Sequence, residues 1–346
     1  MELVGKAKGL FREEKKRQDK EEGNMQKVKV AYIGVPNAQY MESLVESAPA
    51  GFFVKDLSGT ADQGEMLREL EDADFLIQRR RIPDELYRAC KRLKLLQLTS
   101  AGYDYVPMPV LREMGIPVAN IGGANAIAVA EHVVTLMLMV LRQIIPSMVA
   151  LRDGKWQMDM DENQYAELYQ KTVGIVGLGN IGRWVGRIVS GFGAQVVFCD
   201  AFKMPLTMAT LIPGTQVTLE KLLRIADIVS LNAPLNKDTQ ALIGRDELEL
   251  MKPNAILINT CRGKVVDEAA LIDALRQQRI AGAGLDVFEQ EPIDLGNPLL
   301  QMEQVVCTPH IGGAAREKFP RQLSQIWGNF EAVLRGERPV SLVSTE

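Results

Sequence analysis

The stretch VGIVGLGNIG, from Val173 to Gly182, decides the fold of this 346-residue chain. It spaces Gly177, Gly179 and Gly182 as G-x-G-x-x-G, after a β-like run and before a helix-like segment. In that context the first glycine allows a tight turn, the second lets a pyrophosphate approach the backbone, and the third lets helix and strand pack closely. The stretch therefore predicts a βαβ unit that binds a dinucleotide.

An acidic residue supports this interpretation. Asp200 ends the next strand-like run, QVVFCD, about 20 residues farther along, where a carboxylate contacts the ribose hydroxyls. No arginine follows it directly to accept a 2′-phosphate, so NAD is favoured over NADP, although Lys203 lies nearby. The structural alternative is a glycine-rich turn without a ligand.

Strand-like and helix-like stretches alternate on both sides of the motif, which predicts an α/β fold with parallel sheets. Downstream, the strands DIVSLN, AILINT and GAGLDV alternate with the helices TLEKLLRIA, TQALIGRDELELM and DEAALIDALRQQ. Upstream, the series begins with KVKVAYIG at Lys27 and continues with GFFVKD, ADFLIQ and LKLLQLTSAG. The apolar stretch from Ala126 to Ile145 predicts a buried helix at a domain or subunit interface, and residues 314–334 predict a final amphipathic helix.

Composition excludes several classes of protein. With 47% hydrophobic residues and a net charge of −4, the chain can bury a large core and lacks the basic character of a nucleic-acid binder. No apolar run reaches the roughly 18 residues of a membrane span. Residues 1–26 mix both charge signs and lack the apolar core of a signal peptide, so we expect a charged surface extension, either helical or disordered. Four cysteines without metal-like spacing indicate a reduced cytoplasmic protein without a metal site.

Polar residues suited to catalysis follow three successive strands. Arg262 follows AILINT, Asp286 and Glu291 follow GAGL, and His310 follows VVCTP. In open α/β sheets, ligands bind beyond the carboxyl ends of the strands, so these side chains should surround one crevice. An arginine holds a carboxylate and polarises a carbonyl, a histidine donates a proton near neutral pH, and a carboxylate on the other ring nitrogen orients the imidazole.

Each of these residues also has a structural alternative. Arg262 could pair with a surface acid, Glu291 could be solvated, and His310 could cap a backbone carbonyl. The other histidine, His132, lies in an apolar helix, and we interpret it as a packing residue. Cys261 borders Arg262, but its neighbours do not indicate a nucleophile.

From about Lys27 to Pro339, the chain resembles the NAD-dependent D-isomer-specific 2-hydroxyacid dehydrogenases. The resemblance is carried by GIVGLGNIG, MKPNAILINTCRGKVVDEAAL, GLDVFEQEP and TPHIGG, in that order. It implies that Arg262, Glu291 and His310 form the catalytic set, with His310 as proton donor and Glu291 as its partner. Further cofactor contacts implied by the resemblance, beyond the three glycines and Asp200, are Asn180, Ile181, Ala233, Thr260, Cys261, Asp286 (to the nicotinamide amide) and Gly312.

The family's architecture implies two Rossmann-like domains. A coenzyme domain, residues 123–309, would be inserted into a discontinuous, flavodoxin-like substrate domain, residues 27–122 and 310–346, with the active site in the cleft at the hinge. The loop TSAGYD matches the family segment whose amides bind the substrate carboxylate, and QRRR matches a loop that faces the cleft. The substrate contacts implied in this way are Ser100, Ala101, Gly102, Arg79 and Arg80.

The activity implied is the NAD(H)-dependent interconversion of a small 2-oxo acid, such as glyoxylate, hydroxypyruvate or pyruvate, with its D-2-hydroxy acid. The resemblance also implies a homodimer, in which Trp156 reaches a partner's cleft.

The chain departs from the family pattern at some positions. Asn232 stands where many members have a histidine, and Glu291 argues against formate dehydrogenases, which pair their histidine with glutamine. The phosphite-oxidising relatives have a lysine in the loop that reads TSAGY here. The alternative function is an NAD-sensing, corepressor-like binding protein of the same superfamily.

Overall fold

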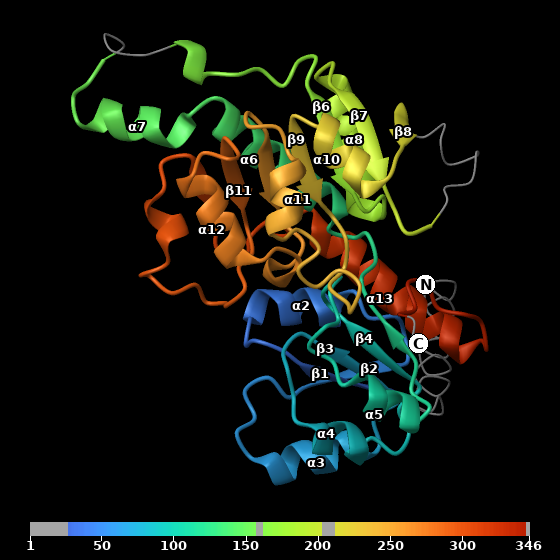
Figure 1. Cartoon of the computed structure of the whole chain (residues 1–346). Helices are drawn as coiled ribbons and strands as arrows, with labels where there is room; N and C mark the ends of the chain where they lie inside the picture. Colours follow the sequence, from blue (N-terminus) through green and yellow to red (C-terminus); the bar gives the residue numbers. More distant parts are fainter. Residues whose placement is uncertain (1–26, 157–161, 203–211, 344–346) are drawn as a thin grey trace, which may run out of the picture. The chain divides into compact units, whose positions relative to one another are not determined.

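The computed structural model describes residues 27–156, 162–202 and 212–343. The chain divides into two compact units (Figure 1): unit 1 runs to Ile121 and resumes at Phe319, and unit 2 is Gly122–Lys318. Along the sequence, unit 2 is therefore inserted into unit 1. The predicted N-terminal extension and Lys203 lie outside the described residues.

Unit 1 is built on a parallel sheet whose described strands lie in the flavodoxin-like order β2-β1-β3-β4-β5. Strands β3 and β4 are buried at every residue, which explains why their sequences are mostly apolar. The strands are β1 (Val28–Ile33), β2 (Phe52–Asp56), β3 (Phe75–Gln78), β4 (Leu95–Leu98) and β5 (Val118–Ala119). The helices are α2 (Ala38–Glu46), α3 (Gln63–Glu71), α4 (Asp84–Ala89), α5 (Met108–Glu113) and α13 (Lys318–Leu334).

The last segment of the chain completes the core of unit 1. On α13, the ring of Phe330 stacks on Phe75 with centroids 4.2 Å apart. The indole of Trp327 donates a hydrogen bond of 3.0 Å to Ser47 Oγ. Beyond the helix, Leu342 forms an antiparallel bridge with Ala119 in β5. Segments at opposite ends of the sequence thus share one hydrophobic core.

Unit 2 is built on a longer parallel sheet, whose described strands lie in the order β12-β11-β10-β9-β6-β7-β8. With β6 as the first strand, this is the Rossmann order extended by one strand, and its switch point lies between β6 and β9. The strands are β6 (Thr172–Val176), β7 (Gln195–Cys199), β8 (Gly214–Gln216), β9 (Ile228–Leu231), β10 (Ile256–Asn259), β11 (Gly282–Leu285) and β12 (Val305–Cys307). The helices are α6 (Ala126–Leu141), α7 (Ile144–Arg152), α8 (Asn180–Gly191), α10 (Leu219–Ile225), α11 (Arg245–Leu250) and α12 (Glu268–Arg276), with short 3-10 turns η2 (Glu162–Gln164), η3 (Gly263–Val265) and η4 (Pro298–Gln301).

Two helices of unit 2 are shorter than the sequence predicts. The helix expected to run from Ala126 to Ile145 ends at Leu141, because Gln143 adopts a left-handed conformation with φ of 48°. The helix expected over residues 239–251 begins only at Arg245. Ala241 also has a left-handed backbone conformation, and Ile243 forms an isolated parallel β-bridge with Val266, so neither residue can be helical.

Helix α6 packs against α8, β10, β11 and β12 of its own unit. These contacts are sufficient to explain its apolar composition without a subunit interface. No single helix in the described parts of the chain is long and apolar enough to cross a membrane. The pair α6 and α7, bent by 60° at their junction, meets that test by length and composition alone.

The second junction between the units differs from the predicted one. The expected boundary falls between Pro309 and His310, whereas the compact units divide between Lys318 and Phe319. The reason is local hydrogen bonding: the backbone amides of His310, Ile311 and Gly312 all donate to Asp286, at the end of β11. His310 therefore belongs to unit 2.

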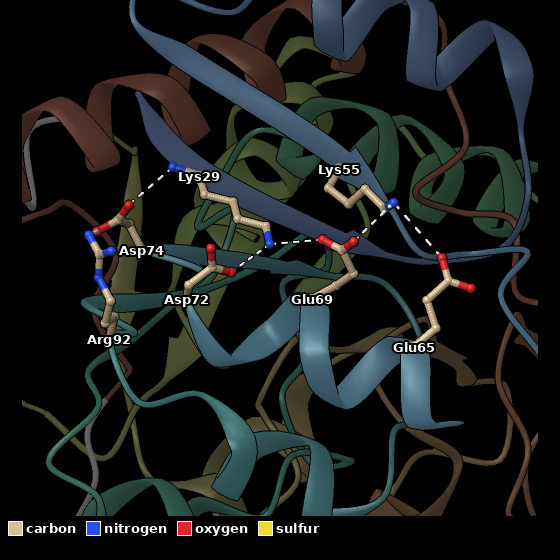
Figure 2. A network of polar contacts seen from close by, with 7 residues as sticks. All are labelled: Lys29, Lys55, Glu65, Glu69, Asp72, Asp74 and Arg92. Carbon is tan, nitrogen blue, oxygen red and sulfur yellow. Dashed lines mark hydrogen bonds and ion pairs between the residues drawn. The ribbon is translucent and has the colours of Figure 1, made fainter. Parts of the chain in front are cut away.

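An ion-pair network lies at the amino ends of the strands of unit 1 (Figure 2). Lys29 Nζ bridges Glu69 Oε2 at 2.8 Å and Asp72 Oδ1 at 2.5 Å, which ties β1 to the end of α3. Asp74, only 4% exposed, accepts from the backbone N–H of Lys29 and from Arg92, both at 3.1 Å. Exposed pairs contribute little to stability, whereas a buried acceptor that binds a backbone amide contributes more.

Replacing Asp74 with alanine should destabilise unit 1 by about 1–3 kcal/mol, because the Lys29 amide loses its acceptor and Arg92 and Lys94 lose their shared carboxylate. Hydrogen exchange at the β1 and β3 amides, together with the urea midpoint, measures the effect. The control is Glu65→Ala, which removes an exposed carboxylate 3.9 Å from Lys55. Equal effects of the two variants would contradict the prediction.

Candidate active site

The glycine-rich turn of unit 2 has the geometry of a dinucleotide site. Gly177 has φ of +90°, which side chains disfavour, and a Cβ on Gly182 would overlap the carbonyl oxygen of Gly177. Beside Gly179, by contrast, a Cβ would meet no described atom within 4 Å, which leaves room against the backbone. Helix α8 begins at Asn180. The backbone amides of its first residues, Asn180 and Ile181, have no partner within the helix and are available to a phosphate.

Asp200, directly after β7, lies next to this turn. Its Oδ2 accepts a 2.7 Å hydrogen bond from the amide of Leu178, and its Oδ1 accepts one of 3.0 Å from the amide of Phe202. Asn232, after β9, also lies next to the turn: its backbone carbonyl is 3.0 Å from the Cβ position of Gly177. Its side-chain Oδ1 is buried without a hydrogen-bond partner in the described structure. The turn, the acid and this orphaned acceptor together fit a dinucleotide.

The remaining candidate cofactor contacts follow neighbouring strands of the same sheet. Ala233 follows β9, and Thr260 and Cys261 follow β10, so all three lie at the carboxyl edge. Burial raises the pKa of Cys261 to about 11. Its thiol is therefore protonated near neutral pH, which agrees with the prediction that it is not a nucleophile.

Arg262 is held by the turn that follows β10. Its carbonyl oxygen accepts a 2.9 Å hydrogen bond from Asn259 Nδ2, and its Nη1 donates a 2.7 Å hydrogen bond to the carbonyl of Cys261. At the next residue, Gly263, a Cβ would overlap the backbone carbonyl of Phe288 in the loop after β11. The missing side chain thus lets the loops after β10 and β11 touch, which brings Arg262 close to Glu291.

His310 and Glu291 form a direct pair in unit 2. His310 Nδ1 lies 2.7 Å from Glu291 Oε2, and Glu291 Oε1 accepts a 3.1 Å hydrogen bond from the amide of Phe288. Because Nδ1 is engaged, Nε2 is the nitrogen left to exchange a proton with a ligand. The side chains of His310 and Glu291 are 46% and 36% exposed, so the pair is accessible.

The pair shifts the pKa values of both partners. The hydrogen bond that the His310 ring donates to Glu291 raises the pKa of His310 above its ordinary 6.5, against the opposing effects of burial and of the Arg262 charge. Burial alone would raise the pKa of Glu291, but the hydrogen bonds from His310 and Phe288 and the two nearby cations lower it below its usual range. The two shifts have the same meaning: the contact stabilises the charged form of each partner, an imidazolium facing a carboxylate.

Asp286 directly follows β11 and is almost fully buried, with its side chain 2% exposed. Its Oδ1 accepts from Thr308 Oγ1 at 2.6 Å and from the amide of Ile311 at 2.9 Å, and its Oδ2 accepts from the amide of Gly312 at 2.8 Å. The carboxylate is thus largely engaged by the loop after β12. Its contact with the nicotinamide amide stays a prediction.

The predicted substrate residues belong to unit 1, at the carboxyl ends of adjacent strands β3 and β4. In the loop after β4, Ser100 Oγ donates to the carbonyl of Gly102 at 2.7 Å, and Asn120 Nδ2 donates to the carbonyl of Ala101 at 2.7 Å. After β3, Arg79 and Arg80 are exposed, and the Arg79 guanidinium lies 5.4 Å from the ring centroid of Tyr40. Their roles stay predictions.

Two polar residues of the site escape the sequence reasoning. Thr308, two positions before His310, binds Asp286, and His132 Nε2 lies 2.9 Å from Thr308 Oγ1. The sequence places His132 on an apolar helix, which indicates packing, and nothing in its spacing from residue 308 shows that the two meet. For Thr308, its place at the end of a strand beside His310 was the available signal.

Comparisons with known proteins agree with this geometry. Residues 134–312 match the family model of the NAD-binding domain of the D-isomer-specific 2-hydroxyacid dehydrogenases. A glyoxylate reductase of Thermofilum pendens is 40% identical over 289 residues, covering 82% of this chain and 84% of the relative. The chain belongs to this family. The fold, the family and NAD as cofactor, all predicted from the sequence, are thereby confirmed.

Two further relatives show how far the likeness extends. A hydroxypyruvate reductase of Blautia hydrogenotrophica is 31% identical over 296 residues, covering 84% of this dehydrogenase and 91% of the relative. The crystal structure of a D-isomer-specific 2-hydroxyacid dehydrogenase from Lactobacillus delbrueckii ssp. bulgaricus, in its NAD complex, has a TM-score of 0.76 at 27% identity. That match covers 91% of this chain and all of that one.

Replacing Glu291 with glutamine should lower the pKa of His310, because the variant loses the carboxylate that stabilises the imidazolium. The protonated form would then be lost at a lower pH than in the wild-type dehydrogenase. NMR titration of isotope-labelled histidine rings measures this directly, since the chain has only two histidines.

The matched control is Glu289→Gln. Glu289 is exposed and accepts from the amide of Glu268 rather than from His310. A pKa of His310 that stays the same in Glu291→Gln, or that falls equally in the control, would show that the pair is not its cause.

Proposed function

We propose that the enzyme reduces a small 2-oxo acid, such as glyoxylate, hydroxypyruvate or pyruvate, to its D-2-hydroxy acid, with His310 as the proton donor. The observation that carries the proposal is the 2.7 Å contact of His310 Nδ1 with Glu291 Oε2 at the carboxyl edge of the dinucleotide-type sheet. It is supported by the relatives named glyoxylate reductase and hydroxypyruvate reductase.

The reduction requires a hydride at the carbonyl carbon and a proton at the carbonyl oxygen. Reduced NAD, when bound, supplies the hydride. His310 supplies the proton from Nε2, because Nδ1 is bonded to Glu291. Because the pKa of His310 is raised above its ordinary 6.5, the imidazole stays protonated to a higher pH than a free histidine would, and reduction should weaken as the pH rises through that pKa.

We propose that Arg262 binds the substrate carboxylate and polarises its carbonyl. Its place beside His310 and Glu291 is supported by the effect of its charge on both of their pKa values. We also propose that unit 1 is the substrate domain and unit 2 the coenzyme domain. In unit 1, the amides of residues 100–102 would bind the carboxylate, and Arg79 or Arg80 would contact the rest of the substrate.

Steady-state oxidation of NADH with a panel of 2-oxo acids tests the function. His310→Asn should lose about 10²–10⁴-fold in kcat, because the proton donor is removed. Arg262→Ala should lose kcat/KM for the 2-oxo acid and leave NADH binding, measured by fluorescence, unchanged.

Lys264→Ala is the matched control, because Lys264 is an exposed cation two positions after Arg262. Wild-type turnover by His310→Asn would refute the assignment of the proton donor. Tight NADH binding without turnover on any 2-oxo acid would replace the proposal with the NAD-sensing alternative.

We propose that the enzyme is a homodimer that pairs through α7. None of the residues of this helix is buried, although its sequence is IIPSMVALR. Met148 and Leu151 are 45% and 57% exposed, and the nearby Trp156 is 73% exposed. An apolar surface of this kind is typical of a protein interface.

Met148→Glu combined with Leu151→Glu should convert a dimer into a monomer, because two carboxylates would be buried in the interface. Light scattering at fixed protein concentration measures the mass. Leu295→Glu, which alters a leucine that is 86% exposed, is the control and should leave the dimer intact. A wild-type monomer would refute the dimer, and a dimeric double variant would refute the role of α7.

We also propose a cytoplasmic location, where thiols stay reduced. All four cysteines are free, and burial raises each pKa: Cys90 to about 12, and Cys199, Cys261 and Cys307 to about 11. Thiols that burial keeps protonated fit a reducing compartment.

A further inference from the structure

A chain of polar groups runs beneath the loop that carries His310. His132 Nε2 lies 2.9 Å from Thr308 Oγ1, and Thr308 Oγ1 lies 2.6 Å from Asp286 Oδ1. All three residues belong to unit 2, on α6, after β12 and after β11 respectively. Hydrogen bonds thus connect the apolar helix α6 to the carboxyl edge of the sheet.

The donor of each hydrogen bond in this series of polar groups can be assigned by counting protons. Asp286 is ionised, because both of its carboxylate oxygens accept hydrogen bonds, from Thr308 and from the amides of Ile311 and Gly312, and these donors lower its pKa against the effect of burial. The single hydroxyl proton of Thr308 is therefore donated to Asp286, as the 2.6 Å distance indicates. His132 must then donate its Nε2 proton to the oxygen of Thr308, since a hydroxyl has no second proton to give.

Asp286 in turn fixes the backbone of three consecutive residues. Its carboxylate accepts from the amides of Ile311 and Gly312, and its carbonyl accepts from the amide of His310 at 2.9 Å. His310 has φ of 53°, a left-handed conformation that a residue with a side chain adopts at a cost. The hydrogen bonds to Asp286 hold it there.

The hydrogen-bonded groups of His132, Thr308 and Asp286 are closely packed. A Cβ on Gly312 would lie 2.9 Å from Asp286 Oδ2 and 3.2 Å from His132 Cδ2. The carboxylate is 2% exposed, and His132 Nε2, 3.4 Å from Oδ1, is the only cationic or potentially cationic atom that the described residues place in ion-pair range of it. A buried carboxylate that loses a donor is costly, so His132 and the loop should be coupled energetically.

We propose that His132 is a positioning residue for the proton donor: by donating to Thr308, it keeps Asp286 and the loop of residues 310–312 in the arrangement that directs His310 toward Glu291. This inference rests on the proposed function for its catalytic meaning, but its structural content stands on the contacts above. His132 itself touches no reacting atom.

The test compares His132→Leu with His132→Gln. Glutamine places an N–H near the position of Nε2 and should restore the donor, whereas leucine keeps the volume and removes the donor. In His132→Leu we expect the pKa of His310 to fall by about half a unit or more, since the loop loosens and the contact with Glu291 lengthens. Three charged groups face His310, namely Glu291, Arg262 and Asp286, and none of them is altered by the substitution.

The measurements are NMR titration of the labelled histidine ring and steady-state kinetics of 2-oxo acid reduction. His310 is the sole histidine left in both variants, so its signal needs no assignment. His132→Leu should lower kcat about ten- to a hundredfold with the KM for NADH unchanged. His132→Gln should recover most of both properties. Thr135→Ala, which removes an exposed hydroxyl from the same helix, is the control.

Equal losses in the leucine and glutamine variants, or an unchanged His310 in His132→Leu, would overturn the inference. If His132→Leu does not fold, Thr308→Val breaks the same chain from β12, with Thr308→Ser as its conservative counterpart, and the same criteria apply. A wild-type enzyme that reduces no 2-oxo acid would overturn the proposed function, whereas the titration would still decide the role of His132.

Discussion

One buried carboxylate, Asp286, is the point on which the site depends. Its side chain and carbonyl together accept from the amides of His310, Ile311 and Gly312, and its own amide donates to Asn259 at the end of β10. Asn259 also holds the carbonyl of Arg262. The positions of the arginine and the histidine are therefore set by hydrogen bonds that meet at adjacent strand ends, in a region where water does not compete.

The parallel sheet explains why this convergence is possible. Strands β10, β11 and β12 are neighbours and parallel, so their carboxyl ends deliver Arg262, Glu291 and His310 to the same edge. Gly263 removes the side chain that would otherwise separate the loops after β10 and β11. The glycine-rich turn after β6 lies at the same edge, two strands away from β10. The fold thus brings the dinucleotide-type turn and the proposed acid–base pair to one edge with a single arrangement of strands.

Much of this was predictable because it depends on local sequence. The turn at Gly177 requires a residue that tolerates positive φ, and the strand ends follow from runs of buried apolar residues, so both leave a direct signal. The break at Gln143 left none, since glutamine carries no preference that marks a left-handed position. The contact between His132 and Thr308 joins residues far apart in the sequence, and its existence depends on how α6 packs on the sheet. The expected end of the inserted domain differs from the end of the compact unit for the same reason: the hydrogen bonds of residues 310–312 to Asp286 are tertiary contacts.

The exposure of the His310–Glu291 pair means that the pair contributes little to stability, in keeping with the chemical role proposed for it. An ion pair that is 46% and 36% exposed contributes about 1 kcal/mol or less, because water screens it. The supporting contacts of Asp286 are buried, and there the loss of a single donor is costlier. Two carboxylates only five positions apart therefore have different effects. Asp286 is buried and holds the loop of residues 310–312. Glu291 is accessible and raises the proton affinity of the His310 imidazole. Because the proton affinity of His310 rests on an exposed contact, it is sensitive to anything that moves the loop, and the rigidity that Asp286 provides becomes part of the proposed acid–base chemistry.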